Sequence, residues 1–195
     1  MQLSNIGRKE NGFTLIEMAI VLVIIGLILG VVLNGQNLIR SAKKKRLISH
    51  FREFEASFNT FYDRYGQYPG DENDIKGIPF PEGDTENGNG NGFIDGAEDD
   101  NFGRYVWRDL AKAGICQRKN ENPFGGVYGW RSINFHPSES PGINHFRNTV
   151  YATNVPADLA REIDLDYDDG IWNTGEIMAD GNYLAVNLVI LYWRL

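Results

Sequence analysis

An uninterrupted apolar segment near the N-terminus constrains this chain more than any other feature. The segment runs from Phe13 to Leu33, and Thr14 and Glu17 are its only residues with polar side chains. A helix of this length crosses the ~30 Å hydrocarbon layer of a bilayer. It is also longer than the apolar core of a secretory signal peptide. We therefore expect one membrane-spanning helix at this end of the chain.

Glu17 is unexpected in such a segment. A carboxylate at membrane depth is costly, and it tends to mark a functional partner. Gly26 and Gly30 add a small-xxx-small spacing that allows two helices to approach closely. A plain signal anchor would explain the length of the segment but would leave Glu17 without a role.

The stretch GFTLIEMAIVLVIIGLILG, which begins at Gly12, resembles the N-terminal signal of type IV pilins and type II secretion pseudopilins. In that family a prepilin peptidase cuts after the glycine and methylates the new N-terminal residue. The resemblance implies cleavage between Gly12 and Phe13 and N-methylation of Phe13. It also implies that Glu17 pairs with the Phe13 amine of a neighbouring subunit during assembly. A cationic amine from a partner would offset the cost of burying this carboxylate.

The resemblance also implies a cellular location and a set of partners. Before assembly the chain would cross the inner membrane once and contact membrane lipid, with its head outside. Afterwards it would form part of a periplasmic or extracellular filament. Its partners would be further copies of itself, other pilins, the prepilin peptidase and the inner-membrane assembly machinery. The basic residues after the span, Arg40 and Lys43 to Arg46, would alone favour a cytoplasmic head.

Apolar residues continue at helical spacing beyond the span and predict one helix from about Thr14 to Tyr65. Gly66 and Pro69 would end this helix. Its second half would pack an aromatic stripe against a globular head. The stripe consists of Leu47, Phe51, Phe54, Phe58, Phe61 (or Tyr62) and Tyr65.

The C-terminal half is rich in β-branched and aromatic residues, which predict three or four antiparallel strands. Short helices are expected at Tyr105–Ala113 and within PADLAREID. The predicted fold class is therefore α+β and pilin-like, with a long N-terminal helix packed on an antiparallel sheet. We expect a leader at 1–12, a membrane-spanning or filament-core helix at 13–35, an amphipathic helix at 36–66, and a head at 67–195 with an acidic loop at 82–100.

The acidic loop fits the template of a twelve-residue calcium loop. The template places a glycine, Gly92, at its sixth position, and it predicts weak binding because few of the ligands are charged. Some pseudopilins bind calcium in a similar loop, which favours the metal over a solvated loop that caps the next helix. The predicted ligands are Asn87, Asn89, Asn91, the carbonyl of Phe93, Asp95 and Glu98.

A second acidic stretch, DLDYDDGIWNTGEI, is a weaker candidate for a metal site. It lacks glycine at the sixth template position and glutamate at the twelfth. A structural turn before a strand is the favoured interpretation. The candidate ligands are Asp164, Asp166, Asp168 and Asp169.

Charge and composition exclude several function classes. Residues after Arg46 carry a net charge of −12, so the head should repel phosphate, and direct nucleic-acid binding is not expected. The single cysteine, Cys116, allows neither an intramolecular disulfide nor a thiolate zinc cluster. No catalytic motif is recognisable, so we do not expect an enzyme.

The leading hypothesis is a structural subunit of a type IV pilus or related filament. A major or minor pseudopilin of a type II secretion system is the alternative. More remote is a membrane-anchored, calcium-dependent binding module that never polymerises. Such a module would tolerate replacement of Glu17 by leucine, whereas a pilin would not.

Overall fold

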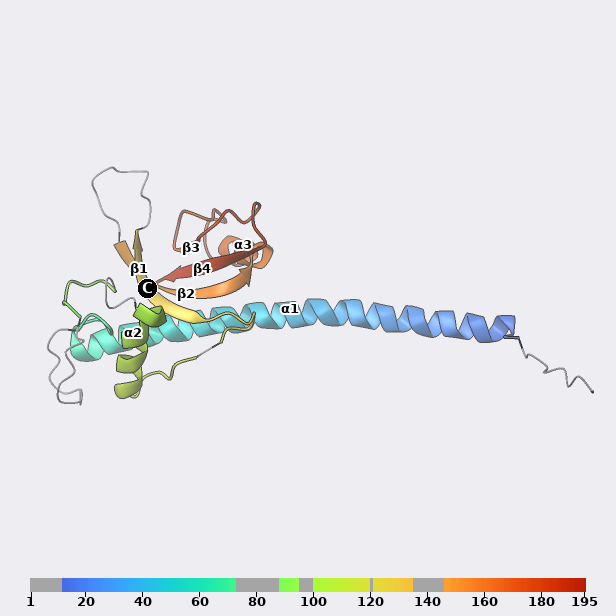
Figure 1. Cartoon of the computed structure of the whole chain (residues 1–195), viewed down its shortest axis with the longest axis horizontal. Coiled ribbons are helices and arrows are strands. Elements are labelled where there is room, and N and C mark those ends of the chain that lie inside the picture. Colours follow the sequence, from blue (N-terminus) through green and yellow to red (C-terminus); the bar gives the residue numbers. More distant parts are fainter. Residues whose placement is uncertain (1–11, 73–87, 95–99, 120, 135–145) are drawn as a thin grey trace, which may run out of the picture. The chain divides into compact units, whose positions relative to one another are not determined.

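The computed structural model describes residues 12–72, 88–94, 100–119, 121–134 and 146–195. The chain forms two compact units, Met1–Ala42 and Lys43–Leu195, and the first helix contributes to both. The elements, in chain order, are α1 (Leu15–Tyr65), α2 (Asp100–Lys112), β1 (Tyr128–Asn134), β2 (Phe146–Pro156), α3 (Ala157–Tyr167), β3 (Ile177–Ala179) and β4 (Leu188–Arg194) (Figure 1).

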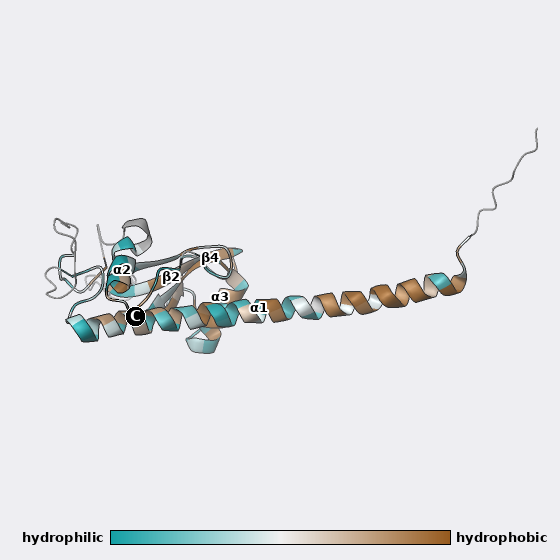
Figure 2. Ribbon diagram, turned by 90° about the horizontal axis from the view of Figure 1, so that it is seen from below, coloured by the Kyte–Doolittle hydropathy of each residue, from teal (hydrophilic) through white to brown (hydrophobic). Residues whose placement is uncertain are grey.

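The first unit consists of the N-terminal part of α1, whose apolar side chains lie on its surface. Figure 2 shows this part as almost continuously hydrophobic. The exposed residues include Leu15, Leu22 and Val31, among many others of the same kind. This part of α1 is long and apolar enough to cross a membrane, as the sequence predicted.

The second unit is built on a four-stranded antiparallel sheet with strand order β1-β2-β4-β3. The C-terminal part of α1 packs on it through rings from every turn. Phe51 stacks on Trp193 of β4, and Phe58 stacks on Trp130 of β1. The predicted aromatic stripe is confirmed from Leu47 to Phe61, because Leu47, Phe51, Phe54, Phe58 and Phe61 are all buried. Tyr65, its last member, is half-buried against the same core, and Tyr62 is exposed.

The expected α+β, pilin-like class is thus confirmed, with local differences. Helix α2 begins at Asp100, five residues earlier than predicted. Gly103, which interrupts the helical sequence pattern, lies against Trp130, and a Cβ there would come within 2.6 Å of the Trp130 Cβ. The short strand β3 was not assigned from sequence. All three of its residues are buried, so it lacks the alternation that identifies a half-exposed strand.

Candidate functional site

The first turn of α1 is closed by a reciprocal pair of side chains, Thr14 and Glu17. The Thr14 backbone amide and hydroxyl both donate to Glu17 Oε2, at 2.7 and 2.8 Å. The Glu17 amide donates to Thr14 Oγ1 at 3.3 Å. This is a capping box, which satisfies amides that have no acceptor within the helix. Both bonds to the carboxylate end on the same oxygen.

Phe13 and the glycines of the apolar segment are available for contacts with other molecules. Phe13, the residue that would follow the cleavage site, is 84% exposed. Added Cβ atoms at Gly26 and Gly30 would meet nothing within 4 Å. The small-xxx-small face is therefore open, and such a face allows close approach of a second helix.

In the second unit, the carboxylate of Asp71 anchors the predicted calcium loop. Asp71 is only 2% exposed. Its Oδ1 accepts from the amides of Gly90 and Asn91 at 2.9 and 3.1 Å, and its Oδ2 accepts from Gly92 at 2.6 Å. Gly92 has a φ of 89°, which favours glycine. The loop therefore wraps around a negative charge contributed from just after α1.

Three of the six predicted calcium ligands are described by the structure. Asn89 Oδ1 accepts from the Asn91 amide at 2.9 Å, and Asn91 Oδ1 accepts from the Phe93 amide at 2.8 Å. These bonds fold the loop into successive side-chain-capped turns. The other predicted ligands, Asn87, Asp95 and Glu98, lie outside the described residues.

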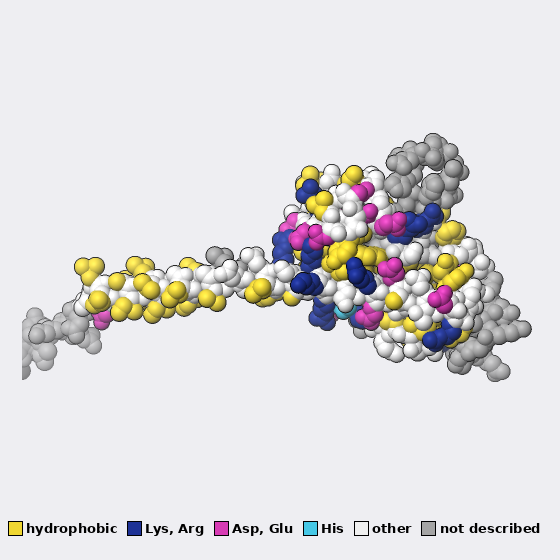
Figure 3. Space-filling model, turned by 180° about the vertical axis from the view of Figure 1, so that it is seen from behind, with side chains coloured by type: hydrophobic (Ala, Val, Ile, Leu, Met, Phe, Trp, Pro, Cys, Tyr) yellow, Lys and Arg dark blue, Asp and Glu magenta, His cyan; other side chains and the backbone are white. Residues whose placement is uncertain are grey.

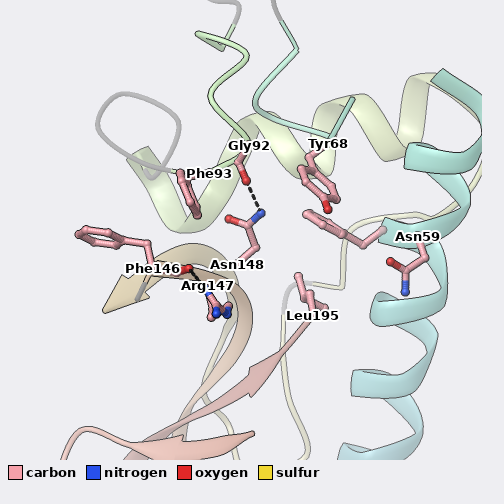
Figure 4. A pocket seen from close by; sticks show the side chains of 9 residues that line it. Asn59, Tyr68, Gly92, Phe93, Phe146, Arg147, Asn148 and Leu195 are labelled. Atoms are coloured by element: carbon pink, nitrogen blue, oxygen red, sulfur yellow. Dashed lines mark hydrogen bonds between the residues drawn. The ribbon is translucent and has the colours of Figure 1, made fainter. Parts of the chain in front are cut away.

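The buried side chain of Asn148 fixes the far end of this loop to β2. Its Oδ1 accepts from the Ile94 amide and its Nδ2 donates to the Gly92 carbonyl, both at 2.9 Å. Figure 4 shows Asn148 pointing to Gly92 at the edge of a cavity of about 170 Å³ between α1, β2 and the loop. Both ends of the Asn148 amide are therefore engaged in holding the loop to β2.

Two buried carboxyl groups tie the segment after α1 to α2. Glu72 is 1% exposed and Asp109 is fully buried, and both accept from the Gly70 amide at 2.8 Å. Arg108 Nε lies 3.0 Å from Asp109 Oδ1, and Arg108 Nη2 lies 3.3 Å from Glu72 Oε1. Burial, and next the neighbouring Asp109, raises the pKa of Glu72 to about 8. Burial also raises the pKa of Asp109.

The second acidic stretch forms the turn between α3 and β3. Carboxylate oxygens of Asp164, Asp168 and Asp169 lie within 4.8 Å of one another, so three oxygen ligands are in place for a hard cation. Asp166 is not part of this cluster, because it pairs with Lys44. The structure thus brings together three of the four predicted residues.

Each aspartate of the cluster also holds the turn itself. Asp164 accepts from the Tyr183 hydroxyl at 2.8 Å, and Asp168 accepts from the Ile177 amide at 2.8 Å. Asp169 accepts from Thr174 Oγ1 at 2.5 Å. Burial, with Asp168 and Asp169 close by, raises the pKa of Asp164. The predicted turn before a strand is present between α3 and β3, and its three clustered aspartates also keep the metal site a candidate.

Comparison with protein families adds a match at the N-terminus. Residues 7–33 match the family described as the prokaryotic N-terminal methylation motif. The chain carries a prepilin-type signal. This signal is the signature of type IV pilins and pseudopilins, and it points to a structural protein rather than an enzyme. No curated protein and no solved structure matches the chain.

Sequence reasoning missed three functional groups of this prepilin-type chain. The Thr14 cap had a local signal, since Thr and Glu three positions apart before an apolar run predict a capping box. Asp71 had none, because the amides that it binds lie about twenty residues further along the chain. Glu72 had none for the same reason, since its partner Asp109 lies much later in the chain, in α2.

Proposed function

We propose that the chain is a structural subunit of a type IV pilus or a related filament. Prepilin peptidase cuts between Gly12 and Phe13 and methylates Phe13, and the exposed helix that follows polymerises. The observation that carries this proposal is the methylation motif at residues 7–33, most of which forms the start of α1 with its apolar side chains exposed. A contiguous apolar surface of this extent must be covered by lipid or by other chains.

Glu17 favours the assembled subunit over the single subunit in the membrane. Thr14 donates two hydrogen bonds to one carboxylate oxygen, Oε2, and these neutral donors do not cancel the charge of an ionised Glu17. Cleavage converts the backbone nitrogen of Phe13 into a cationic amine, one residue before Thr14. In a filament, the amine of one subunit neutralises Glu17 of the next, which offsets the cost of a carboxylate in an apolar environment.

We propose calcium as the ion of the head. The predicted loop ligands are Asn87, Asn89, Asn91, Phe93, Asp95 and Glu98, and Asp71 supports the site because it brings a buried carboxylate to the same loop. The loop amides already hold the Asp71 carboxylate in one orientation, so binding an ion would not have to order this side chain. Few charged ligands imply weak binding, in the range of extracellular modules. The Asp164 cluster is a second candidate site for a hard cation.

Sequencing the mature N-terminus tests the proposed function. Filaments sheared from cells that express the chain should contain it with methylated Phe13 as the first residue. An intact Met1 in the assembled fibre would refute processing. Short fibres that form only together with a secretion machine would instead identify a pseudopilin.

A further inference from the structure

Two exposed basic residues lie on α1 at the start of the second unit. Lys45 and Arg46 are both exposed, and neither has an ion-pair partner within the described part of the chain. Ser49, also exposed, follows them by about one helical turn. Figure 3 shows Lys and Arg side chains gathered on α1, with acidic side chains nearby. We call Lys45, Arg46 and Ser49 the basic face.

A second surface of the same unit has the opposite charge. Helix α3 buries Leu159 and Ile163 and turns its other side to solvent. Between residues 157 and 176, α3 and the turn after it contain seven acidic residues and one basic residue, Arg161. The exposed side also carries apolar groups, since Leu165 is 52% exposed. We call Glu162, Leu165, Asp166 and Asp169 the acidic face.

Lys44 shows that a lysine of α1 binds the acidic face. Its Nζ lies 2.6 Å from Glu162 Oε1 and 2.6 Å from Asp166 Oδ2. One ammonium group therefore serves two carboxylates, and the side chains of both acids remain about half exposed. Lys45 follows Lys44 by about 100° around the helix, so it leaves α1 in a different direction.

We propose that the basic face of one copy docks on the acidic face of the next copy. The proposed contact is head-to-tail: each copy uses its basic face toward one neighbour and its acidic face toward the other. Repeated without closing into a ring, such a contact produces an open helical array. Opposite charges orient the incoming subunit, and Leu165 supplies apolar area at the centre of the contact. The inference rests on the proposed filament function and adds the residues that set the order of the heads.

Crosslinking between two variants that each carry one engineered cysteine tests this arrangement. The only native cysteine, Cys116, is buried, so engineered cysteines are the accessible thiols. Full-length Ser49→Cys and Leu165→Cys chains, with different epitope tags, are co-expressed and treated in membranes with a short bifunctional thiol reagent. Both changes keep every charge of the two faces. We expect mixed dimers from the pair and none above background from either variant alone.

Salt and charge reversal show whether the crosslink depends on the proposed contact. Raising the salt from 0.01 to 1 M should lower the yield of mixed dimer about threefold or more, because exposed charges are screened. Adding Lys45→Glu and Arg46→Glu to the Ser49→Cys chain should lower it similarly. Gln117→Cys, at another exposed position, replaces Ser49→Cys as the matched control and should give no mixed dimer with Leu165→Cys.

Three outcomes overturn the inference. They are the absence of mixed dimer from correctly folded variants, equally abundant dimers from one variant alone, and a yield insensitive to the charge reversal. Processing at Phe13 and filament formation are scored separately in the same cells. If filaments form but residues 49 and 165 do not crosslink, the proposed function stands and the head-to-tail contact fails. A crosslink without filaments supports the contact and contradicts the filament.

Discussion

Glu72 and Asp109 accept hydrogen bonds from the same backbone amide, that of Gly70, at 2.8 Å each. Two acidic groups this close in a buried site cannot both ionise cheaply, even beside Arg108. Burial, and next the charge of Asp109, raise the pKa of Glu72, so Glu72 is the group of the pair that holds a proton. The pair joins the segment after α1 to α2 through the shared Gly70 amide.

We predict that the stability of the head declines as the pH rises from 4.5 to about 8. The pKa of Glu72 is raised from its ordinary value of 4.5 to about 8, so the folded state binds one more proton than the unfolded state in this window. The stabilising effect is complete below pH 4.5 and is lost as the pH passes 8. Thermal unfolding of the detergent-solubilised chain at several pH values measures this loss of stability. Each kcal/mol lost should lower the melting temperature by about 2–4 °C.

The variant Glu72→Gln is the control for this pH dependence. Glutamine keeps the shape and can still hydrogen-bond to Asp109, but it does not ionise. The slope of the melting temperature between pH 5 and 8 should become shallower than in the parent chain. An unchanged slope would assign the pH dependence to other groups.

Replacing Asp71 with alanine should destabilise the head by ~1–3 kcal/mol. The Gly92 amide would lose its acceptor, whereas the Gly90 amide would keep the Asp71 carbonyl and the Asn91 amide would keep Asn89 Oδ1. Asn89→Ala removes an exposed acceptor of the same loop and should cost ~1 kcal/mol or less. Denaturant unfolding compares the two variants, and equal effects would argue against Asp71 as the anchor.

Neutralising Glu17 should abolish filament assembly and leave membrane insertion intact. Glu17→Leu removes both the charge and the cap, whereas Glu17→Gln keeps an acceptor for Thr14 and removes only the charge. Thr14→Ala weakens the cap, at a cost of ~1 kcal/mol, and leaves the charge. If charge drives assembly, both Glu17 variants fail and Thr14→Ala assembles. Filament imaging and membrane fractionation measure the two properties, and normal filaments from Glu17→Gln would contradict the ion pair.

Calcium should raise the melting temperature of the head, and a chelator should reverse the effect. A ligand that binds only the folded state stabilises it in proportion to the logarithm of its concentration. Glu98→Ala should abolish the response if the loop is the site. Asp169→Asn should abolish it if the turn after α3 is the site. If neither calcium nor chelator changes the melting temperature, the proposal of a metal site in the head is wrong.

The sequence was informative where the signal is local or periodic. The signal at Gly12 to Glu17, the membrane-length helix and the buried stripe from Leu47 to Phe61 all follow from residue order and helical spacing. It also predicted the acidic turn before β3. The start of α2 was predicted too late, because Gly103 interrupts the helical sequence pattern. Glycine is needed there because a Cβ would come too close to Trp130.

Amino-acid order by itself therefore determined that this chain has a prepilin-type N-terminus, a long helix and an α+β head. Only the tertiary structure decided that Asp71 anchors the asparagine-rich loop, that Glu72 shares an amide with Asp109, and that Lys44 binds α3. The physical reason is range. Helical periodicity and cleavage signals act between residues a few positions apart, whereas these three contacts join groups that are neighbours only after the chain has folded.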